Sequence, residues 1–234
     1  MISVAVIGKG NVGFHLYQEL SKSEVLNVIN LNSRESHDLF DFDVAIIAVS
    51  DDAITEVSQR IQCPLIVHTS GNTHINVLQS SSRKGVFYPL QSFSKEKEVD
   101  FSKIPMCLEA TSDEDFLLLE KLAEELKSTS YRISSEQRRY MHVAAVFANN
   151  FTNHLYQIAF DLCENQQIPA DILLPLIEET AQKVKLLSPQ EAQTGPAIRN
   201  DQETIKKHLH LLSDSQQELY KLITRSIQKY GNKL

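Results

Sequence analysis

The sequence predicts an α/β protein. An N-terminal Rossmann domain with a doubly wound, mostly parallel sheet is expected at residues 1–133, and an all-α domain at residues 134–234. A β-branched apolar run, Ile2–Ile7, opens the chain and leads directly into a glycine-rich turn. Apolar runs of strand length then alternate with helically spaced segments up to residue 133, a pattern that favours parallel pairing. Beyond residue 133 only helical periodicity is found, which predicts the second domain.

The glycine-rich turn lies between the first strand and a helix expected at residues 14–22, and its spacing is G-x-G-x-x-G. Gly8 permits a tight turn, Gly10 lets the main chain approach a pyrophosphate, and Gly13 lets the helix pack close to the strand. Free N–H groups and the positive dipole end of the helix would attract the anion. The candidate cofactor-binding residues here are Gly8, Lys9, Gly10, Asn11, Val12 and Gly13. The alternative is a glycine-rich turn that binds no ligand.

Composition and charge exclude several classes of partner. The formal net charge of −7 over 234 residues argues against a nucleic-acid surface. The apolar start is too short for a signal peptide, and no stretch approaches the roughly twenty apolar residues that span a bilayer, so we expect a cytoplasmic protein without a membrane partner. Cys63, Cys107 and Cys163 lie far apart, which suits free thiols in a reducing cytosol. No metal site is expected, since His208 and His210 would point away from each other on a helix.

The second predicted strand, at residues 25–31, ends in a sequence that bears on cofactor choice. NAD-specific sites usually carry an acid here, which binds the ribose 2′-hydroxyl. Ser33 and Arg34 instead offer a hydroxyl and a guanidinium, which suit a 2′-phosphate. The sequence therefore predicts NADP as the cofactor in preference to NAD. The alternative is that Arg34 is a solvated cation that pairs with Glu35.

Two further apolar runs, at residues 44–49 and 64–68, predict central strands. Ligands bind at the carboxyl ends of such strands, so Val49, Ser50 and Thr69 are candidate cofactor-binding residues. Ser50 or Asp51 also suits the N-cap of a helix at residues 53–60. Thr69, Ser70 and the glycine that follows are expected to face the crevice where nicotinamide and substrate meet, which makes Ser70 a candidate catalytic residue. The alternative for these residues is a plain turn.

The rest of the first domain is expected to complete a sheet of seven or eight strands. Residues 85–93 predict a strand and a rigid turn. In this turn Tyr88 either donates a proton or binds a carboxylate, or it is a half-buried tyrosine with a satisfied hydroxyl. Residues 95–103 are charged and predict an exposed loop, and residues 104–109, 113–127 and 129–133 predict a strand, a helix and a strand.

The second domain is expected to contain helices at residues 135–165, 169–187, 201–212 and 214–230. Residues 141–151 are apolar almost all round, which is typical of a helix buried in a core or a dimer interface. At about 100° per residue, His142, Val146, Asn149 and Asn153 fall along one stripe, with Asn150 on its flank. These polar groups need hydrogen-bond partners, which either a substrate pocket or a buried network between helices supplies.

Residues 194–201 join two of the expected helices. Asn200 or Asp201 suits the N-cap of the helix that follows. Caps do not explain Thr194 and Arg199, which are candidates to reach an anionic substrate or the cofactor phosphate.

Five segments together resemble a known family: residues 8–13, 68–71, 88–93, 142–150 and 194–196. In this order they are similar to Rossmann-like NADP oxidoreductases described as related to deazaflavin-dependent reductases, and the resemblance covers nearly the whole chain. It implies a 6-phosphogluconate-dehydrogenase-like architecture with NADP as cofactor, in which the C-terminal helical domain forms a homodimer and closes the active site. It implies no particular substrate.

One residue departs from the pattern of that family. A histidine commonly precedes the proline of residues 88–93, and Tyr88 takes its place here. A phenol is a far weaker acid than an imidazolium, so a proton-donating role passes to His142 or to water. No lysine matches the catalytic lysine of the hydroxyacid dehydrogenases, and the region of His142 and Asn150 takes its place.

The leading hypothesis is an NADP-dependent oxidoreductase. It would transfer a hydride between the nicotinamide and a small polar substrate, expected to be anionic, that carries a C=O or C=N group. His142, Asn150 and Ser70 are the candidate catalytic residues that orient the substrate, with His142 as proton donor. Two alternatives stay open: an NADP-binding sensor or scaffold without turnover, and a helical domain that serves oligomerisation alone.

Overall fold

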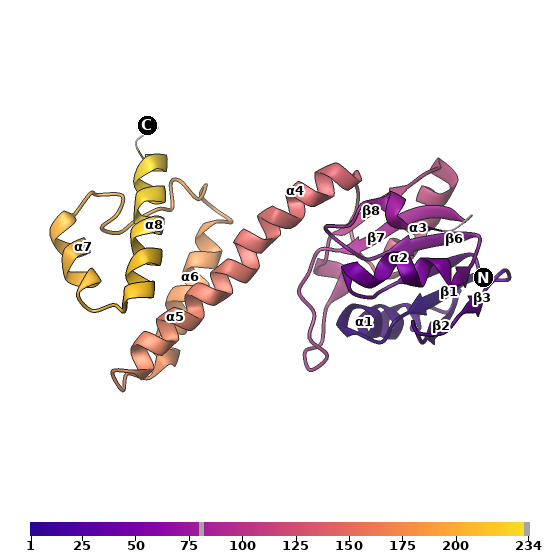
Figure 1. Ribbon diagram of the computed structural model, residues 1–234, viewed down its shortest axis with the longest axis horizontal. Helices are drawn as coiled ribbons and strands as arrows, with labels where there is room; N and C mark the ends of the chain where they lie inside the picture. The colour runs from indigo at the N-terminus through magenta and orange to yellow at the C-terminus, as the bar shows by residue number, and fades with distance from the viewer. Residues whose placement is uncertain (80–81, 232–234) are drawn as a thin grey trace. The chain divides into compact units, whose positions relative to one another are not determined.

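The computed structural model describes residues 1–79 and 82–231 (Figure 1). The chain divides into two compact units, Met1–Thr152 and Asn153–Leu234. The last strand of the sheet ends at Arg132, and the helix that follows begins at Ser135. The boundary expected between residues 133 and 134 therefore coincides with the end of the sheet. It stays a prediction that a separately folding domain ends there.

Within the described residues, the first unit contains a sheet of seven strands in the order β2-β1-β4-β6-β7-β8-β9. Neighbouring strands are parallel except for the antiparallel pair β7 and β8. The predicted α/β class with a mostly parallel sheet is thus confirmed. The strands are β1 (Ile2–Ile7), β2 (Leu26–Leu31), β4 (Val44–Ile47), β6 (Leu65–His68), β7 (Arg83–Pro89), β8 (Met106–Ala110) and β9 (Ser130–Arg132).

Three helices cover the sheet: α1 (Asn11–Leu20), α2 (Asp51–Gln59) and α3 (Asp113–Glu125). Side chains of β1 alternate between its two faces. Val4 and Val6 pack in one cluster with residues of α1 and α3, whereas Ala5 and Ile7 pack in the other with residues of α2. Because α1 and α2 lie on opposite faces, the carboxyl ends of β1 and β4 form the crevice at which open α/β sheets bind ligands.

Small elements of the first unit differ from the expectation. A two-stranded sheet pairs β3 (His37–Asp38) with β5 (Ile61–Gln62), and two residues are too few to produce a periodic signal. Two short 3₁₀ helices, η1 (Ile75–Val77) and η2 (Phe101–Lys103), lie in the connections. Phe101, in the segment expected to be an exposed loop, is buried in the core against the sheet.

The expected helix at residues 135–165 contains a π-helical turn. It comprises α4 (Ser135–Ala145), the π turn η3 (Val146–Phe151) and α5 (Thr152–Glu164). A π turn adds about one residue to an α-helix, so positions beyond it are rotated by about 100° from those of an uninterrupted helix. The polar stripe expected from a uniform 100° per residue is therefore interrupted after Val146, and Asn150 takes the angular position expected for Asn149.

The apolar side chains of this helix are exposed rather than buried. Val143, Phe147 and Phe151 have exposed fractions of 54%, 64% and 51%. A helix buried in the core of its own chain, one of the two alternatives expected for residues 141–151, is therefore not observed, and the alternative of a dimer interface stays open.

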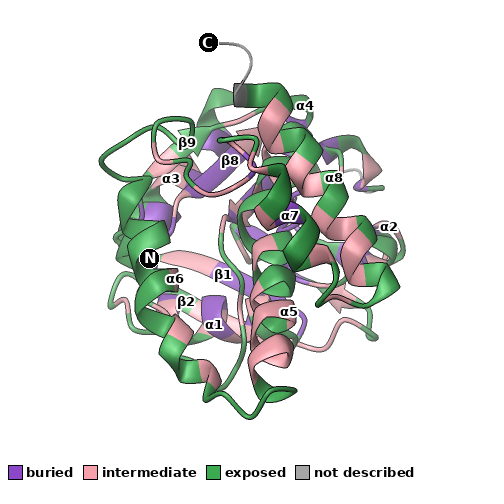
Figure 2. Ribbon diagram, turned by 90° about the vertical axis from the view of Figure 1, so that its left-hand side faces the viewer, coloured by how far each residue is buried: buried purple, intermediate pink, exposed green. Residues whose placement is uncertain are grey.

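The regular elements of the second unit are all helices within the described residues, as expected. Its elements after α5 are η4 (Ala170–Leu173), α6 (Leu174–Lys183), α7 (Gln202–Leu209) and α8 (Asp214–Gly231). Asp201 caps α7 by accepting a hydrogen bond from the Thr204 N–H at 3.1 Å. Among the described apolar side chains of this unit, Ala197 and Ile205 alone are buried. Figure 2 shows the contrast, with buried residues in β1 and β8 and only intermediate or exposed ones in α6 and α8.

No helix in the described part of the chain combines the length and the apolar character that a membrane span requires. The same residues hold no group of three or more histidine, cysteine, aspartate or glutamate side chains that suits a metal ion.

Candidate active site

A cleft of about 410 Å³ lies at the carboxyl ends of β1, β4 and β6, within the first unit. It brings together most of the site residues expected from the sequence: Gly8, Lys9, Gly10, Asn11, Val12, Ser33, Val49, Ser50, Thr69, Ser70 and His142. Ala48, Asp51 and Gly71 complete its lining. Gly13, Arg34 and Asn150 are not part of the lining.

The three glycines of the turn meet different surroundings. Gly8 has a φ of +120°, and a Cβ there would lie 2.3 Å from the main-chain oxygen of Ala48. A Cβ on Gly13 would lie 2.4 Å from the main-chain oxygen of Gly8. A Cβ on Gly10 would meet no atom of the described residues within 4 Å, so their packing does not require a glycine at that position. The bare main chain at Gly10 leaves room for a ligand in the cleft.

The first turn of α1 has the features of an anion-binding site. Gly10 is its N-cap, no side chain caps it, and its first turn carries no acid. Helix α2 also starts at the cleft, but its first turn carries Asp51 and Asp52. Because carboxylates oppose the positive dipole end, an anion is favoured at α1 over α2. The side chain of Asn11 donates to the main-chain oxygen of Phe93 at 2.8 Å, which holds the side chain in place and leaves the main chain of Asn11 open to a ligand.

The residues after β2 form a turn beside the glycine-rich turn. Ser33 is half-buried and lines the cleft, whereas Arg34 is exposed. The Asn32 side chain accepts a hydrogen bond from the Arg34 N–H at 3.1 Å and donates one to the Glu35 carboxylate at 2.8 Å. Among the ion pairs of the described residues none joins Arg34 to Glu35, so the guanidinium stays available to a ligand.

The turn after β6 uses its own polar groups. The Ser70 hydroxyl donates to Thr73 Oγ1 at 2.8 Å and accepts from the N–H groups of Asn72 and Thr73 at 3.1 and 2.9 Å. Since one donor and two acceptor positions are thereby used, this geometry favours the alternative in which Ser70 shapes the turn. The hydroxyl of Thr69 donates a hydrogen bond to the main-chain oxygen of Ile47 at 3.4 Å.

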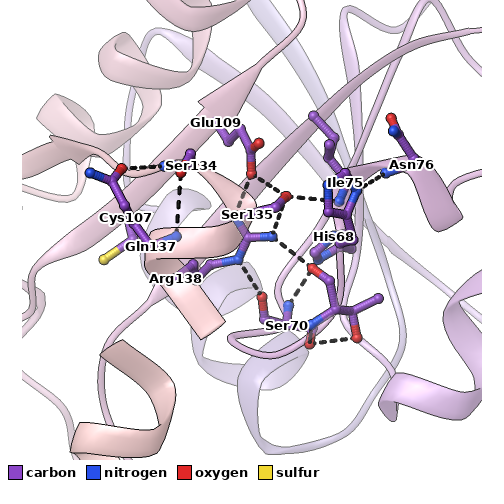
Figure 3. A network of polar contacts seen from close by, with 12 residues as sticks. His68, Ser70, Ile75, Asn76, Cys107, Glu109, Ser134, Ser135, Gln137 and Arg138 are labelled. Atoms are coloured by element: carbon purple, nitrogen blue, oxygen red, sulfur yellow. Dashed lines mark hydrogen bonds and ion pairs between the residues drawn. The ribbon is translucent and has the colours of Figure 1, made fainter. Parts of the chain in front are cut away.

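Arg138, on α4, connects this turn to the sheet (Figure 3), and its side chain is fully buried. Its guanidinium donates to the main-chain oxygens of Ser70 and Thr73 at 3.1 and 2.7 Å and pairs with the Glu109 carboxylate on β8 at 2.5 Å. Ser135 accepts from Arg138 at 3.1 Å and donates to Glu109 at 2.7 Å. A buried guanidinium that makes four hydrogen bonds in this way holds its partners in one geometry.

Sequence reasoning did not identify Arg138. An arginine one turn into a predicted helix is ordinarily solvated, and apart from Ser135 its partners lie 29 or more positions away in the sequence. The closest available signal is the serine three residues earlier, which lies on the same helix face.

His142 lies one turn beyond Arg138 on α4 and is the part of this helix that lines the cleft. Its Nδ1 atom lies 3.4 Å from the hydroxyl of Tyr88 on β7. Gly71 lies against both, because a Cβ there would come within 2.6 Å of His142 Nδ1 and 2.8 Å of the Tyr88 oxygen. Burial raises the pKa of Tyr88.

His68, at the end of β6, is a second histidine close to this region. It is fully buried, and burial together with the charge of Arg138 lowers its pKa to about 3. Its Nδ1 accepts a hydrogen bond from the Ser70 N–H at 3.1 Å, whereas Nε2 has no hydrogen-bond partner among the residues that the structure describes. His68 is therefore neutral at physiological pH and is no source of protons there.

Asn150, a candidate catalytic residue, lies in the π turn and is exposed. Thr194 and Arg199 are exposed residues of the second unit, and their approach to a ligand stays a prediction.

Comparisons with solved structures show related folds. A crystal structure from Bacteroides fragilis, provisionally named an NADP oxidoreductase, is 36% identical, with a TM-score of 0.83 over 97% of this chain and 98% of that one. A protein of Thermotoga maritima is 20% identical, with a TM-score of 0.74 over 98% of each chain. A 1-pyrroline-5-carboxylate reductase of Streptococcus pyogenes is 14% identical, with a TM-score of 0.65 over 99% and 97%. A search of curated proteins found no match.

The family assignment rests on the second half of the chain as well as on the fold. Residues 104–227 match the model of the family described as "Domain of unknown function (DUF2520)". This match spans more than half of the 234 residues, and the Bacteroides fragilis relative extends the likeness over the N-terminal sheet. The chain therefore belongs to the DUF2520 family.

Proposed function

We propose that the protein binds NADP in this cleft and is an oxidoreductase. Its substrate in this proposal is a small polar, anionic compound with a C=O or C=N group. The observation that carries the proposal is the uncapped first turn of α1 with the bare main chain of Gly10, in the cleft that His142 also lines. The name of the Bacteroides fragilis relative supports the cofactor. A structurally similar imine reductase of Myxococcus stipitatus in complex with NADP⁺ illustrates C=N chemistry on this fold.

The cofactor residues divide into three groups in this proposal. The main chain at residues 9–12 holds the pyrophosphate, while Gly8 and Gly13 give the turn its shape. Ser33 and Arg34 bind the 2′-phosphate, for which a free guanidinium is the suited partner. Val49, Ser50 and Thr69 line the path toward the nicotinamide. When bound, NADP supplies or accepts the hydride. The residues of the chain bind and orient the substrate and exchange the proton with it.

His142 is the proton donor in this proposal, because it is the histidine that lines the cleft and imidazole is the side-chain group suited to proton exchange near neutral pH. Asn150 orients the substrate, and Ser70 acts through the shape of its turn. The resemblance to proteins described as related to deazaflavin-dependent reductases, which the sequence suggested, adds deazaflavins to the substrates that we propose to test.

A second copy of the chain covers the helical unit in this proposal. Only Ala197 and Ile205 among the described apolar side chains of that unit are buried, whereas Leu176, Leu186 and Leu211 have exposed fractions of 64%, 85% and 80%. An unaided unit of this size needs a buried apolar core, so a partner surface is required. Homodimerisation is measured by light scattering, and a monomer at all concentrations contradicts this part of the proposal.

We also propose that the protein resides in a reducing cytoplasm, because its three cysteines are free.

Titration calorimetry with NADPH and NADH tests the cofactor, and a panel of imines, ketoacids and deazaflavins tests turnover. We expect tighter binding of NADPH and oxidation of NADPH by at least one class. Equal affinities contradict the role of Ser33 and Arg34. Binding without oxidation across the panel favours the alternative of a sensor or scaffold.

A further inference from the structure

We propose that Tyr88 is a positioning residue for His142. Its hydroxyl donates a hydrogen bond to His142 Nδ1 and thereby holds the neutral ring in the tautomer that carries its proton on Nε2. The use of that proton in reduction rests on the proposed function, but the tautomer itself does not.

The direction of the hydrogen bond follows from the surroundings of Tyr88. Its hydroxyl lies 3.4 Å from His142 Nδ1, and the two rings meet edge to face with centroids 6.4 Å apart. Burial raises the pKa of the phenol, so it keeps its proton at neutral pH. In the described part of the chain the structure gives this hydroxyl no other hydrogen-bond partner. If the histidine donated instead, the half-buried phenol O–H would have no protein acceptor.

Gly71 provides the space that this contact needs. A Cβ at Gly71 would lie 2.6 Å from His142 Nδ1 and 2.7 Å from Tyr88 Cζ, closer than real Cβ contacts. Gly71 is absent from the glycines of positive φ, so its backbone accepts alanine and the space alone requires a glycine. The Arg138 guanidinium donates to the neighbouring main-chain oxygen of Ser70 at 3.1 Å and holds the turn in place.

The consequence is a defined proton donor at the cleft. With Nδ1 engaged by Tyr88, the neutral ring has its N–H on Nε2, and His142 is the α4 residue that lines the cleft. Without Tyr88, the ring is free to place its proton on either nitrogen.

The tautomer is measured by long-range ¹H–¹⁵N correlation spectra of the uniformly ¹⁵N-labelled full-length protein at about pH 8.5, where an ordinary histidine is neutral. The signals of His142 are assigned by their loss in His142→Gln. We expect a protonated Nε2 and an unprotonated Nδ1 in the wild type. In Tyr88→Phe we expect loss of the separation between the two nitrogen resonances. Tyr140→Phe is the control, because it removes the hydroxyl of an 81% exposed tyrosine on the same helix as His142. It is expected to keep the wild-type pattern of resonances.

Gly71→Ala is the second variant, because it displaces the two rings while both side chains are retained. It is expected to move the His142 resonances in the same direction as Tyr88→Phe. A protonated Nδ1 in the wild type, or an unchanged pattern in folded Tyr88→Phe, overturns the inference. NADPH titration of the same samples separates the two proposals: binding without the expected tautomer refutes only the role of Tyr88, and the tautomer without binding refutes only the cofactor site.

Discussion

Replacing Gly10 by alanine separates ligand binding from folding. Gly10 has φ −70° and ψ −177°, a conformation open to alanine, and the added methyl group meets no protein atom within 4 Å. The free energy of unfolding is expected to change by less than about 1 kcal/mol, because alanine restricts the unfolded chain but is a poorer N-cap than glycine, and the two effects oppose each other. The methyl group would instead occupy the space in which a phosphate approaches the first turn of α1.

The expected loss of affinity for NADPH follows from the hydrogen bonds that the methyl group would prevent. A hydrogen bond between a main-chain N–H and a charged phosphate contributes about 1.5–3 kcal/mol. Losing one weakens NADPH binding roughly 10- to 150-fold. Gly13→Ala is the matched variant, since its Cβ would lie 2.4 Å from the main-chain oxygen of Gly8. It is expected to destabilise the fold by about 1–3 kcal/mol through overpacking.

The assay pairs titration calorimetry of NADPH with urea unfolding followed by circular dichroism, for the wild type and both variants. Gln18→Ala, an exposed change on α1, is the control that alters neither quantity. A folded Gly10→Ala protein that binds NADPH with wild-type affinity would refute the reasoning, because the main chain at Gly10 then contacts no phosphate.

Three further predictions concern charge. Arg34→Ala is expected to weaken NADPH binding roughly 10- to 150-fold and NADH binding little, because it removes a charge-assisted bond to the 2′-phosphate; an equal loss for both cofactors in calorimetry contradicts this. Arg138→Met is expected to lower the free energy of unfolding by about 3–5 kcal/mol, since it leaves the Glu109 carboxylate without its buried partner, whereas exposed Arg139→Met changes it by less than about 0.5 kcal/mol; equal urea midpoints contradict this. His68 has a pKa of about 3 in the fold and an ordinary value of 6.5, so as pH falls below 6.5 the unfolded chain gains a proton that the folded protein does not. Stability is expected to fall by about 2 kcal/mol between pH 7.5 and 5 from this residue, and a His68→Gln variant with the same pH dependence as the wild type contradicts this.

Many residues that line the cleft could be predicted, because they are neighbours in the glycine-rich turn or directly follow a predicted strand. The glycines of residues 8–13 are constrained by contacts within a strand, a turn and a helix, and these leave a local pattern. Ser33, Val49 and Thr69 follow predicted strands, and parallel strands bring their carboxyl ends together at one edge. The roles of these residues stay predictions, although the structure gathers them around one cleft.

The substrate half could not be predicted in the same way. Tyr88 and His142 are 54 positions apart, and Arg138 is 68 positions from Ser70, so no periodicity or spacing relates them. The π turn was missed because its mixture of apolar and polar residues fits an ordinary α-helix equally well. The one residue that a π turn adds changes which side chains face a neighbouring element. The apolar face at Val143 was expected to be covered, and the pattern alone does not say by what.

The sequence by itself determined the fold class, the order of the seven strands of the main sheet and of the longer helices, and the place of the glycine-rich turn, because short-range sterics and hydrophobic periodicity act between residues close in the chain. Only the tertiary structure decided that Arg138 is buried, that Ser70 uses its hydroxyl within its own turn, and that Tyr88 meets His142. These features depend on which side chains of distant strands and helices share a desolvated space, where an unpaired polar group is costly and each donor must find an acceptor.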